Sequence, residues 1–221
     1  MINRVIRKIK ALAGIKQSHI EYWRSRASNL GERSVVNMEY NIPVEEITNY
    51  QVEQIFPVLK KQLKGDEKLI LDYGCGTGRF TQLLAKSING KAIGVDVVKM
   101  LINIAKSKDR LNEYLVLKNS KLPFNNNSID IVWVCLVLGG IPEKSIKNVI
   151  QEISRVLADE GLLIVTENTS NKSNNDYWAF RTPETYIDLL RFANMKIAGS
   201  YKEINEEITI FAGRKMKFIK S

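Results

Sequence analysis

Residues 69–80 of this 221-residue chain read Leu69-Ile-Leu-Asp-Tyr-Gly-Cys-Gly-Thr-Gly-Arg-Phe80 and are the most informative part of its sequence. The apolar run LILDY predicts a buried strand, and Gly74, Gly76 and Gly78 follow it directly. Glycines at these positions allow a tight turn and let a ligand approach main-chain N–H groups where a helix begins. Asp96 ends the next predicted strand, where a carboxylate can accept hydrogen bonds from both hydroxyls of a ribose. The pattern therefore predicts a site for a nucleoside-containing cofactor.

Strand and helix signals alternate along the chain after this stretch. Short apolar runs rich in Ile and Val predict buried strands at residues 69–73, 92–96, 114–117, 129–137 and 162–166. Helical patterns occur at residues 79–87, 98–106, 144–157 and 183–193. Two further β signals, at residues 195–202 and 206–215, are joined by a turn too short for a crossover helix. We therefore predict an α/β fold with a doubly wound, seven-stranded, mostly parallel sheet that ends in a C-terminal antiparallel hairpin.

The first 64 residues carry helical patterns only. Residues 18–30 and 43–64 predict two helices, and residues 1–13 predict a third that is basic and amphipathic. We therefore expect an N-terminal helical cap over residues 1–64 and a cofactor-binding domain over residues 65–221. The helix at residues 1–13 has two interpretations: peripheral contact with an anionic membrane or a partner protein, or packing on its own domain.

Composition and charge narrow the classes of function. The chain is 44% apolar and 26% charged, which fits one globular domain with a substantial core. Its net charge of +9 is concentrated at the two ends: residues 1–33 carry +6 and residues 214–221 carry +4, which leaves −1 for the rest. A basic channel for nucleic acid through the body is therefore not indicated, and no DNA partner is expected.

Residues that build metal centres and disulfides are scarce. Cys75 and Cys135 lie sixty positions apart without a CxxC pair, and His19 is the single histidine. We expect no metal site and no disulfide framework, and a reducing, cytoplasmic compartment. The longest charge-free apolar run, residues 131–142, has twelve residues where a bilayer needs about 20, so we expect no membrane span.

The position of the third glycine separates two kinds of cofactor. A dinucleotide fingerprint, G-x-G-x-x-G/A, requires Gly or Ala at position 79, where this chain has Arg79. The third glycine comes one residue earlier, at Gly78, which disfavours a pyrophosphate site. A nicotinamide-dependent oxidoreductase and a non-catalytic nucleotide-binding module remain as alternatives at this point.

The segment LDYGCGTG at residues 71–78 resembles motif I of the class I, Rossmann-like, S-adenosylmethionine (SAM)-dependent methyltransferases. The resemblance continues through LPF at residues 122–124, SIDIV at 128–132, EISRVL at 152–157 and GLLIV at 161–165. The branch that it is most similar to is the small-molecule group called type 11. The resemblance implies a methyltransferase with SAM as cofactor and S-adenosylhomocysteine (SAH) as product.

The same resemblance assigns residues to parts of the cofactor. Asp72 and the Gly74–Gly78 loop would hold the methionine part of SAM. Asp96 would hold the ribose. The adenine would lie against residues that follow the second and third predicted strands: Val97, Asn119 and Ser120.

Signatures that the resemblance links to macromolecular acceptors are missing from the sequence. Neither the [DN]PP[YF] motif of amino-methylating enzymes nor the Pro-Cys nucleophile of cytosine-C5 enzymes follows the fourth strand. We therefore expect a small-molecule or sugar-type acceptor, methylated at oxygen. The alternative is an RNA or protein methyltransferase that binds its substrate through the basic termini.

Two segments supply side chains for an acceptor site. Gly139 and Gly140 follow the fourth strand and leave a bare floor, so that recognition groups must come from the 18–30 helix and the 167–181 loop. The candidate substrate residues are Tyr22, Trp23, Gly139, Tyr177, Trp178 and Arg181. Arg181 would face a carboxylate or phosphate. In a second interpretation of the loop, Trp178 and Phe180 only cover the last helix.

A methylated oxygen also needs a base that removes its proton. His19 is the candidate, because N-terminal helices commonly cover the acceptor pocket in this family. Its alternative is an ordinary surface or capping role, and Glu39 and Glu167 are weaker candidates for the base. We expect the 18–30 helix and the 167–181 loop to close together over the methyl group.

Overall fold

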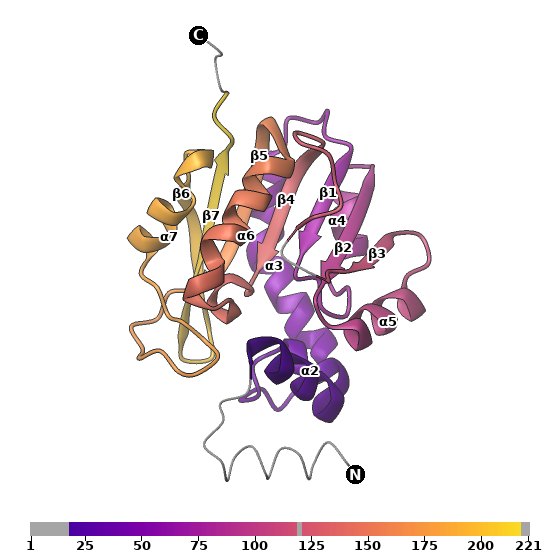
Figure 1. Ribbon diagram of the computed structural model, residues 1–221, viewed down its shortest axis with the longest axis vertical. Coiled ribbons are helices and arrows are strands. Elements are labelled where there is room, and N and C mark those ends of the chain that lie inside the picture. Colours follow the sequence, from indigo (N-terminus) through magenta and orange to yellow (C-terminus); the bar gives the residue numbers. More distant parts are fainter. Residues whose placement is uncertain (1–17, 119–120, 218–221) are drawn as a thin grey trace.

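A seven-stranded sheet in the order β3-β2-β1-β4-β5-β7-β6 runs through the centre of the molecule (Figure 1). The computed structural model describes residues 18–118 and 121–217. The strands are β1 (Leu69–Tyr73), β2 (Lys91–Asp96), β3 (Glu113–Val116), β4 (Ile129–Cys135), β5 (Leu157–Asn168), β6 (Lys196–Glu203) and β7 (Glu206–Arg214). Strands β1 to β5 are parallel, and β6 and β7 form an antiparallel hairpin at one edge. The predicted α/β fold is therefore confirmed.

Helices cover both faces of this sheet (Figure 1). They are α2 (His19–Leu30), α3 (Val44–Gln62), α4 (Thr81–Ser87), α5 (Lys99–Lys108), α6 (Glu143–Val156) and α7 (Pro183–Leu189), with short 3-10 turns η1 (Gly31–Val35), η2 (Leu138–Gly140) and η3 (Arg191–Ala193). α3 and α4 bury their apolar side chains on one face, and α6 and α7 bury theirs on the other. α5 packs along β2 and β3 and also contacts α2.

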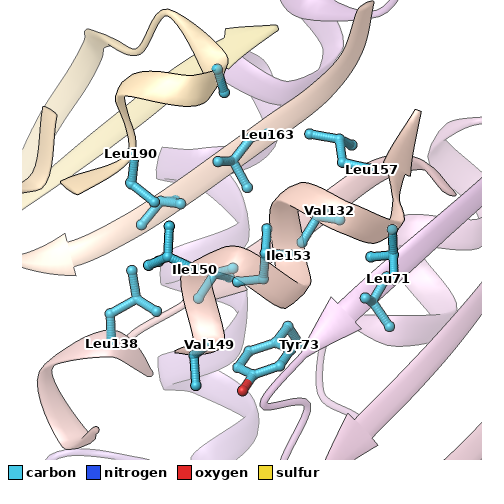
Figure 2. Close-up of a cluster of buried hydrophobic side chains, with 14 of the residues drawn as sticks. Leu71, Tyr73, Val132, Leu138, Val149, Ile150, Ile153, Leu157, Leu163 and Leu190 are labelled. Atoms are coloured by element: carbon cyan, nitrogen blue, oxygen red, sulfur yellow. The ribbon is translucent and has the colours of Figure 1, made fainter. Parts of the chain in front are cut away.

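The two faces of the sheet explain why the strands are continuously apolar. In β1, Ile70 packs under α3 and α4, whereas its neighbour Leu71 packs under α6, and both are fully buried. Successive strand residues point to opposite faces, so a sheet covered on both faces needs apolar residues at every position. Figure 2 shows Val149, Ile150 and Ile153 of α6 directed together at the sheet. Each such buried side chain contributes about 1.5–3 kcal/mol to folding.

The N-terminal helix α2 lies beside the edge where the parallel strands end (Figure 1). Ser18 caps α2: its hydroxyl accepts the Glu21 N–H, while the Glu21 carboxylate accepts the Ser18 N–H at 3.1 Å. Ala27 of α2 packs with Leu101 of α5, which holds α2 against the sheet domain. The predicted helix at residues 1–13 lies outside the described residues. Within the described ranges, no helix is long and apolar enough to cross a membrane.

β4 and β5 differ from their expected limits. β4 ends at Cys135, two residues early, because Leu136 has a φ of 56° and this left-handed backbone turns the chain out of the sheet. β5 begins at Leu157 and continues to Asn168, longer at both ends than its apolar run. Its last residues pair with β7, a long-range contact that no local apolar pattern contains.

Candidate functional site

A cavity of about 1400 Å³ opens at the edge where the parallel strands end. The ends of β1, β2, β4 and β5 line it, together with α2 and residues 175–178. Ligands of open α/β sheets bind outside the carboxyl ends of the strands, as this cavity would allow. The strand order divides the cavity into a β1–β2 half and a β4–β7 half, the second of which also includes the end of β6.

β1 leaves the sheet through the glycine loop, residues 74–78. Gly74 has a φ of +75°, and a Cβ at this position would lie 2.5 Å from Cγ2 of Val137. The N–H of Gly74 donates to the carbonyl of Val95 in β2 at 2.8 Å, which holds the loop against the sheet. Gly74 is therefore required by its left-handed backbone and by close packing on the protein's own side chains.

Asp96 ends β2 with its carboxylate on the cavity wall. One oxygen accepts the N–H of Gly76 at 3.0 Å, and the other accepts the N–H of Val98 at 2.8 Å. Burial raises the pKa of Asp96 to about 6, although these N–H donors act in the opposite direction. The carboxylate is therefore ionised at neutral pH, oriented by the backbone, and still has lone pairs for two ribose hydroxyls.

Asp72 lies in β1 at the base of the glycine loop and is only 3% exposed. Its carboxylate accepts a hydrogen bond from the Thr81 hydroxyl at 2.6 Å. Burial raises the pKa of Asp72 to about 7, while the Thr81 hydrogen bond and the charge of Arg79 oppose this rise. A cation beside Asp72 would favour its ionised form. SAM carries such a cation, the α-ammonium of its methionine part, so the acidic groups of the β1–β2 half fit this cofactor.

The adenine side of the cavity is described in part. Val97 lines the cavity together with Leu117 and Lys118. Val97 and Leu117 provide an apolar wall of the kind that suits the flat face of a base. Asn119 and Ser120, the other two predicted adenine residues, lie outside the described residues.

An aromatic lid joins α2 to the segment after β5. Tyr22 stacks on Tyr177 with ring centroids 3.9 Å apart and an angle of 6° between the planes. His19 meets Tyr177 edge-on at 5.6 Å, and Trp23 meets Trp178 at 6.4 Å. All five of these side chains, which we call the aromatic lid, line the cavity. The two segments that the sequence singled out are therefore in contact.

His19 sits at the rim of the cavity in this lid. Partial burial and the nearby charge of Lys144 lower its pKa, and Asp176 opposes the shift. The imidazole is therefore neutral at pH 7 and has a nitrogen that can accept a proton.

Two predicted substrate residues have different surroundings from those expected. A Cβ on Gly139 would lie 2.4 Å from Cε2 of Trp178, so the indole covers this glycine and the expected bare floor is wrong. The guanidinium of Arg181 donates to the Leu138 carbonyl at 3.1 Å and to Glu143 at 2.7 Å. It is absent from the cavity wall, so the expectation that Arg181 faces an acceptor anion is also incorrect. The cause is long-range packing of the 167–181 loop on the end of β4.

The two weaker base candidates also have other surroundings. Glu167 is fully buried, and its carboxylate accepts the N–H groups of Val137 at 2.7 Å, Leu138 at 2.6 Å and Gly139 at 3.3 Å. Burial raises its pKa to about 7 against the effect of these donors. Glu167 thus fixes the turn after β4, and Glu39 is an exposed side chain that is absent from the cavity wall.

Sequence reasoning missed the polar side chains of the β4–β7 half. Arg79, Asn168, Glu203 and Glu206 line this part of the cavity, which we call the polar chamber. Gln51 of α3 is absent from the cavity wall, and its amide donates to the Glu203 carboxylate from behind at 2.8 Å. Arg79 follows the glycines directly. In the sequence it served only to exclude a dinucleotide fingerprint, and its charge was not considered as part of a binding site. The others come from distant segments, and no local pattern marks them.

Comparisons with known proteins identify relatives of this chain. Residues 71–165 match the model of a family described as "Methyltransferase domain". A demethylmenaquinone methyltransferase from Oceanobacillus iheyensis is 32% identical over 159 residues, which cover 66% of this chain and 63% of that protein. A ubiquinone/menaquinone biosynthesis C-methyltransferase from Campylobacter jejuni is 30% identical over 122 residues, which cover 52% of this chain and 48% of that protein. The matches therefore span less than two thirds of these relatives.

The fold has close counterparts among solved structures. A protein from Methanosarcina mazei described as a SAM-dependent methyltransferase superposes with a TM-score of 0.63 at 21% identity, covering 74% of this chain and 99% of that one. The shared fold, the glycine loop with its two aspartates and the family match over residues 71–165 agree with one another. Residues 71–165 therefore carry a methyltransferase domain, on a fold that the chain shares with a SAM-dependent methyltransferase.

Proposed function

We propose that this protein transfers the methyl group of SAM to a small-molecule acceptor in the β4–β7 half of the cavity. The observation that carries the proposal is the division of one cavity into a half that fits SAM and a half lined by polar and aromatic side chains. The sulfonium methyl of SAM is already electrophilic. The protein therefore has to hold the acceptor in line with the S–CH₃ bond and exclude water, to which the aromatic lid is suited.

The size and lining of the cavity support a small, polar acceptor that contains a ring. Single ligand sites commonly measure about 300–1,000 Å³, and the cavity of about 1400 Å³ leaves room for an acceptor beside the cofactor. The lid offers aromatic faces, and the polar chamber offers hydrogen-bonding groups. A sugar or a phenol presents the matching combination of a flat or ring surface and hydroxyl groups.

The methylated atom is an oxygen or a carbon made nucleophilic by an adjacent oxygen. The sequence favours oxygen, whereas the relatives named for demethylmenaquinone and for C-methylation support carbon. Both transfers start from the same species, because loss of an acidic hydroxyl proton makes the oxygen itself or the neighbouring ring carbon nucleophilic. We therefore propose an acceptor with an acidic hydroxyl, such as a phenol or an enol.

We further propose that His19 accepts this proton. It lines the cavity, and its lowered pKa keeps the imidazole neutral at pH 7. His19→Ala should then lower the transfer rate about 10²–10⁴-fold and leave SAH affinity unchanged. His19→Phe is the matched variant, since it keeps a ring against Tyr177 but has no basic nitrogen. Full turnover in both variants would leave His19 with a purely structural role in the lid.

The proposal is tested first by calorimetry with SAH and then by a screen with labelled SAM. We expect SAH to bind and the screen to find turnover among phenols, quinols or sugars. Binding of NAD in place of SAH would instead support the oxidoreductase alternative. RNA affinity that falls steeply with salt would support the RNA alternative, because release of counterions drives such binding.

A cytoplasmic location and surface contacts through residues 1–13 complete the proposal. Cys75 and Cys135 are both free thiols, which supports a reducing compartment. Peripheral contact of residues 1–13 with anionic lipid would add about 1 kcal/mol for each basic residue near the surface. Equal sedimentation of the full chain and of residues 14–221 with anionic vesicles would exclude the membrane contact.

A further inference from the structure

Arg79 is a partly buried cation at the junction of the two halves of the cavity. It follows the glycine loop directly, and its side chain lines the cavity. The guanidinium lies over the Phe80 ring, 4.7 Å from the centroid. Its Nη1 donates to Thr48 Oγ1 at 3.0 Å and to Gln51 Oε1 at 2.8 Å, so that α3 holds the group in place.

Among the described residues, the hydrogen-bond partners of the Arg79 guanidinium are all uncharged. Thr48 and Gln51 are uncharged, and no carboxylate in these ranges lies within ion-pair distance of the guanidinium. The Nε and Nη2 groups have no hydrogen-bond partner in the described part of the chain, and the residue lines the cavity. Glu203 does not contact Arg79 directly. The side-chain amide of Gln51 lies between them, donating to Glu203 and accepting from Arg79.

An oriented arginine without an anion is costly inside a protein. Burial lowers the pKa of Arg79, and the charges of Glu203 and Asp72 compensate only from a distance. Buried charges are normally paired, and a guanidinium with two free neighbouring N–H groups matches the two oxygens of a carboxylate or an oxyanion. By contrast, Arg26 also lines the cavity, but its Nε and Nη2 donate to the Ser34 and Val36 carbonyls.

We propose that Arg79 is an oxyanion-binding residue of the active site, whose Nε and Nη2 groups bind an anionic oxygen of a ligand in the cavity. The inference rests on the proposed function for its ligands. Two sources provide this chemistry. One is the α-carboxylate of SAM, which lies on the same carbon as the ammonium that Asp72 would hold. The other is the deprotonated oxygen or a carboxylate of the acceptor.

Binding measurements distinguish the two sources without knowledge of the acceptor. Wild type and Arg79→Gln are titrated with SAH, with decarboxylated SAH and with 5′-methylthioadenosine, which lacks the whole amino-acid end. If Arg79 binds the cofactor carboxylate, the variant should bind SAH about 10- to 150-fold more weakly, as expected for loss of a hydrogen-bonded charge. It should bind 5′-methylthioadenosine normally, and wild type should prefer SAH to its decarboxylated form by a similar factor.

The second arm uses protein saturated with SAH and benzoate as the probe anion. If Arg79 binds the acceptor, benzoate should bind wild type in the presence of SAH, and Arg79→Gln should lose this binding while its SAH affinity stays normal. Arg79→Lys keeps the charge but loses the paired N–H geometry, and should fall between the two. Arg24→Gln removes an equal charge from an exposed position of α2 and should change nothing.

Unchanged affinity of Arg79→Gln for SAH and for benzoate would overturn the inference. Failure of wild type to bind SAH would instead contradict the proposed function, so the two failures are distinguishable. Normal 5′-methylthioadenosine affinity shows that the variant is folded. If Arg79→Gln does not fold, the preference of wild type for SAH over decarboxylated SAH and the properties of Arg79→Lys decide between the outcomes.

Discussion

The two halves of the cavity are built in different ways. The β1–β2 half takes its acidic groups from one continuous segment, Asp72 to Asp96, and orients them with backbone N–H groups and the Thr81 hydroxyl. The β4–β7 half collects side chains from α2, the glycine motif, the segment after β5 and the β6–β7 hairpin. The first half presents a fixed backbone geometry, whereas the second depends on side chains that meet only when the chain folds.

This difference shows which part of the site can vary without loss of the fold. Substitutions in the glycine loop disturb its packing on the turn after β4, because a Cβ at Gly74 would strike Val137. The aromatic lid and the polar chamber are made of side chains on elements that the sheet holds independently. Acceptor choice can therefore change by substitution while the cofactor side stays constant.

The largest expected effect is on the β1–β2 half. Asp96→Ala removes the acceptor of two ribose hydrogen bonds, each to a charged group and worth about 1.5–3 kcal/mol. SAH affinity measured by calorimetry should fall about 10²–10⁴-fold. Asp130→Ala is the matched control, since Asp130 also accepts two backbone N–H groups, those of Lys68 and Leu69, but at the other end of β1. Equal SAH affinity of the Asp96 variant and wild type would contradict the assignment of the ribose site.

The next effect concerns the boundary between the halves. Glu167→Ala leaves three backbone N–H groups after β4 without their acceptor, and should lower the free energy of unfolding by about 3 kcal/mol. Urea denaturation measures this loss. Glu167→Gln keeps one amide oxygen and should lose less. If the Ala variant and wild type had the same urea midpoint, water would have replaced the carboxylate at this turn.

A smaller effect is expected from pH. Asp72 must be ionised to hold an ammonium, and its pKa in the free protein is raised to about 7 by burial. SAH binding should therefore release a proton below pH 7, and affinity should fall roughly tenfold for each pH unit below that value. In the free protein the same raised pKa has the opposite effect on stability. Protonated Asp72 stabilises the folded state at pH 4, and this contribution is lost as pH rises through 7. Asp72→Asn should flatten the pH dependence of affinity, and an unchanged profile would exclude Asp72 as its source.

The smallest effect tests whether the aromatic lid is closed without ligand. Tyr22 and Tyr177 stack with parallel rings. A double-mutant cycle of Tyr22→Leu and Tyr177→Leu, measured by urea denaturation, should give a coupling energy of about 0.5–1.5 kcal/mol. Strictly additive single variants would show that the rings do not stack in solution and that α2 and the 167–181 loop move apart.

Local sequence was sufficient to predict the strands and helices and to propose a cofactor side of the cavity. The apolar runs predicted all seven strands, and the glycine spacing with Asp96 predicted a nucleoside cofactor site, of which Gly74, Gly76 and Asp96 line the cavity. The strand limits were less accurate, because Leu136 turns out of β4 through a left-handed conformation and β5 is extended by β7. Arg181 was misplaced for a related reason: an arginine in a polar loop gave no sign that it would pair with Glu143.

The strands, the hairpin and the glycine loop could be predicted from the sequence, because apolar periodicity, a short turn and glycine conformation are properties of neighbouring residues. The tertiary structure alone decided the aromatic lid, the neutral partners of Arg79 and the burial of Glu167. These features join residues more than 20 positions apart in sequence. Their chemistry depends on which side chains share a desolvated space, and only the packing of helices on the sheet determines that.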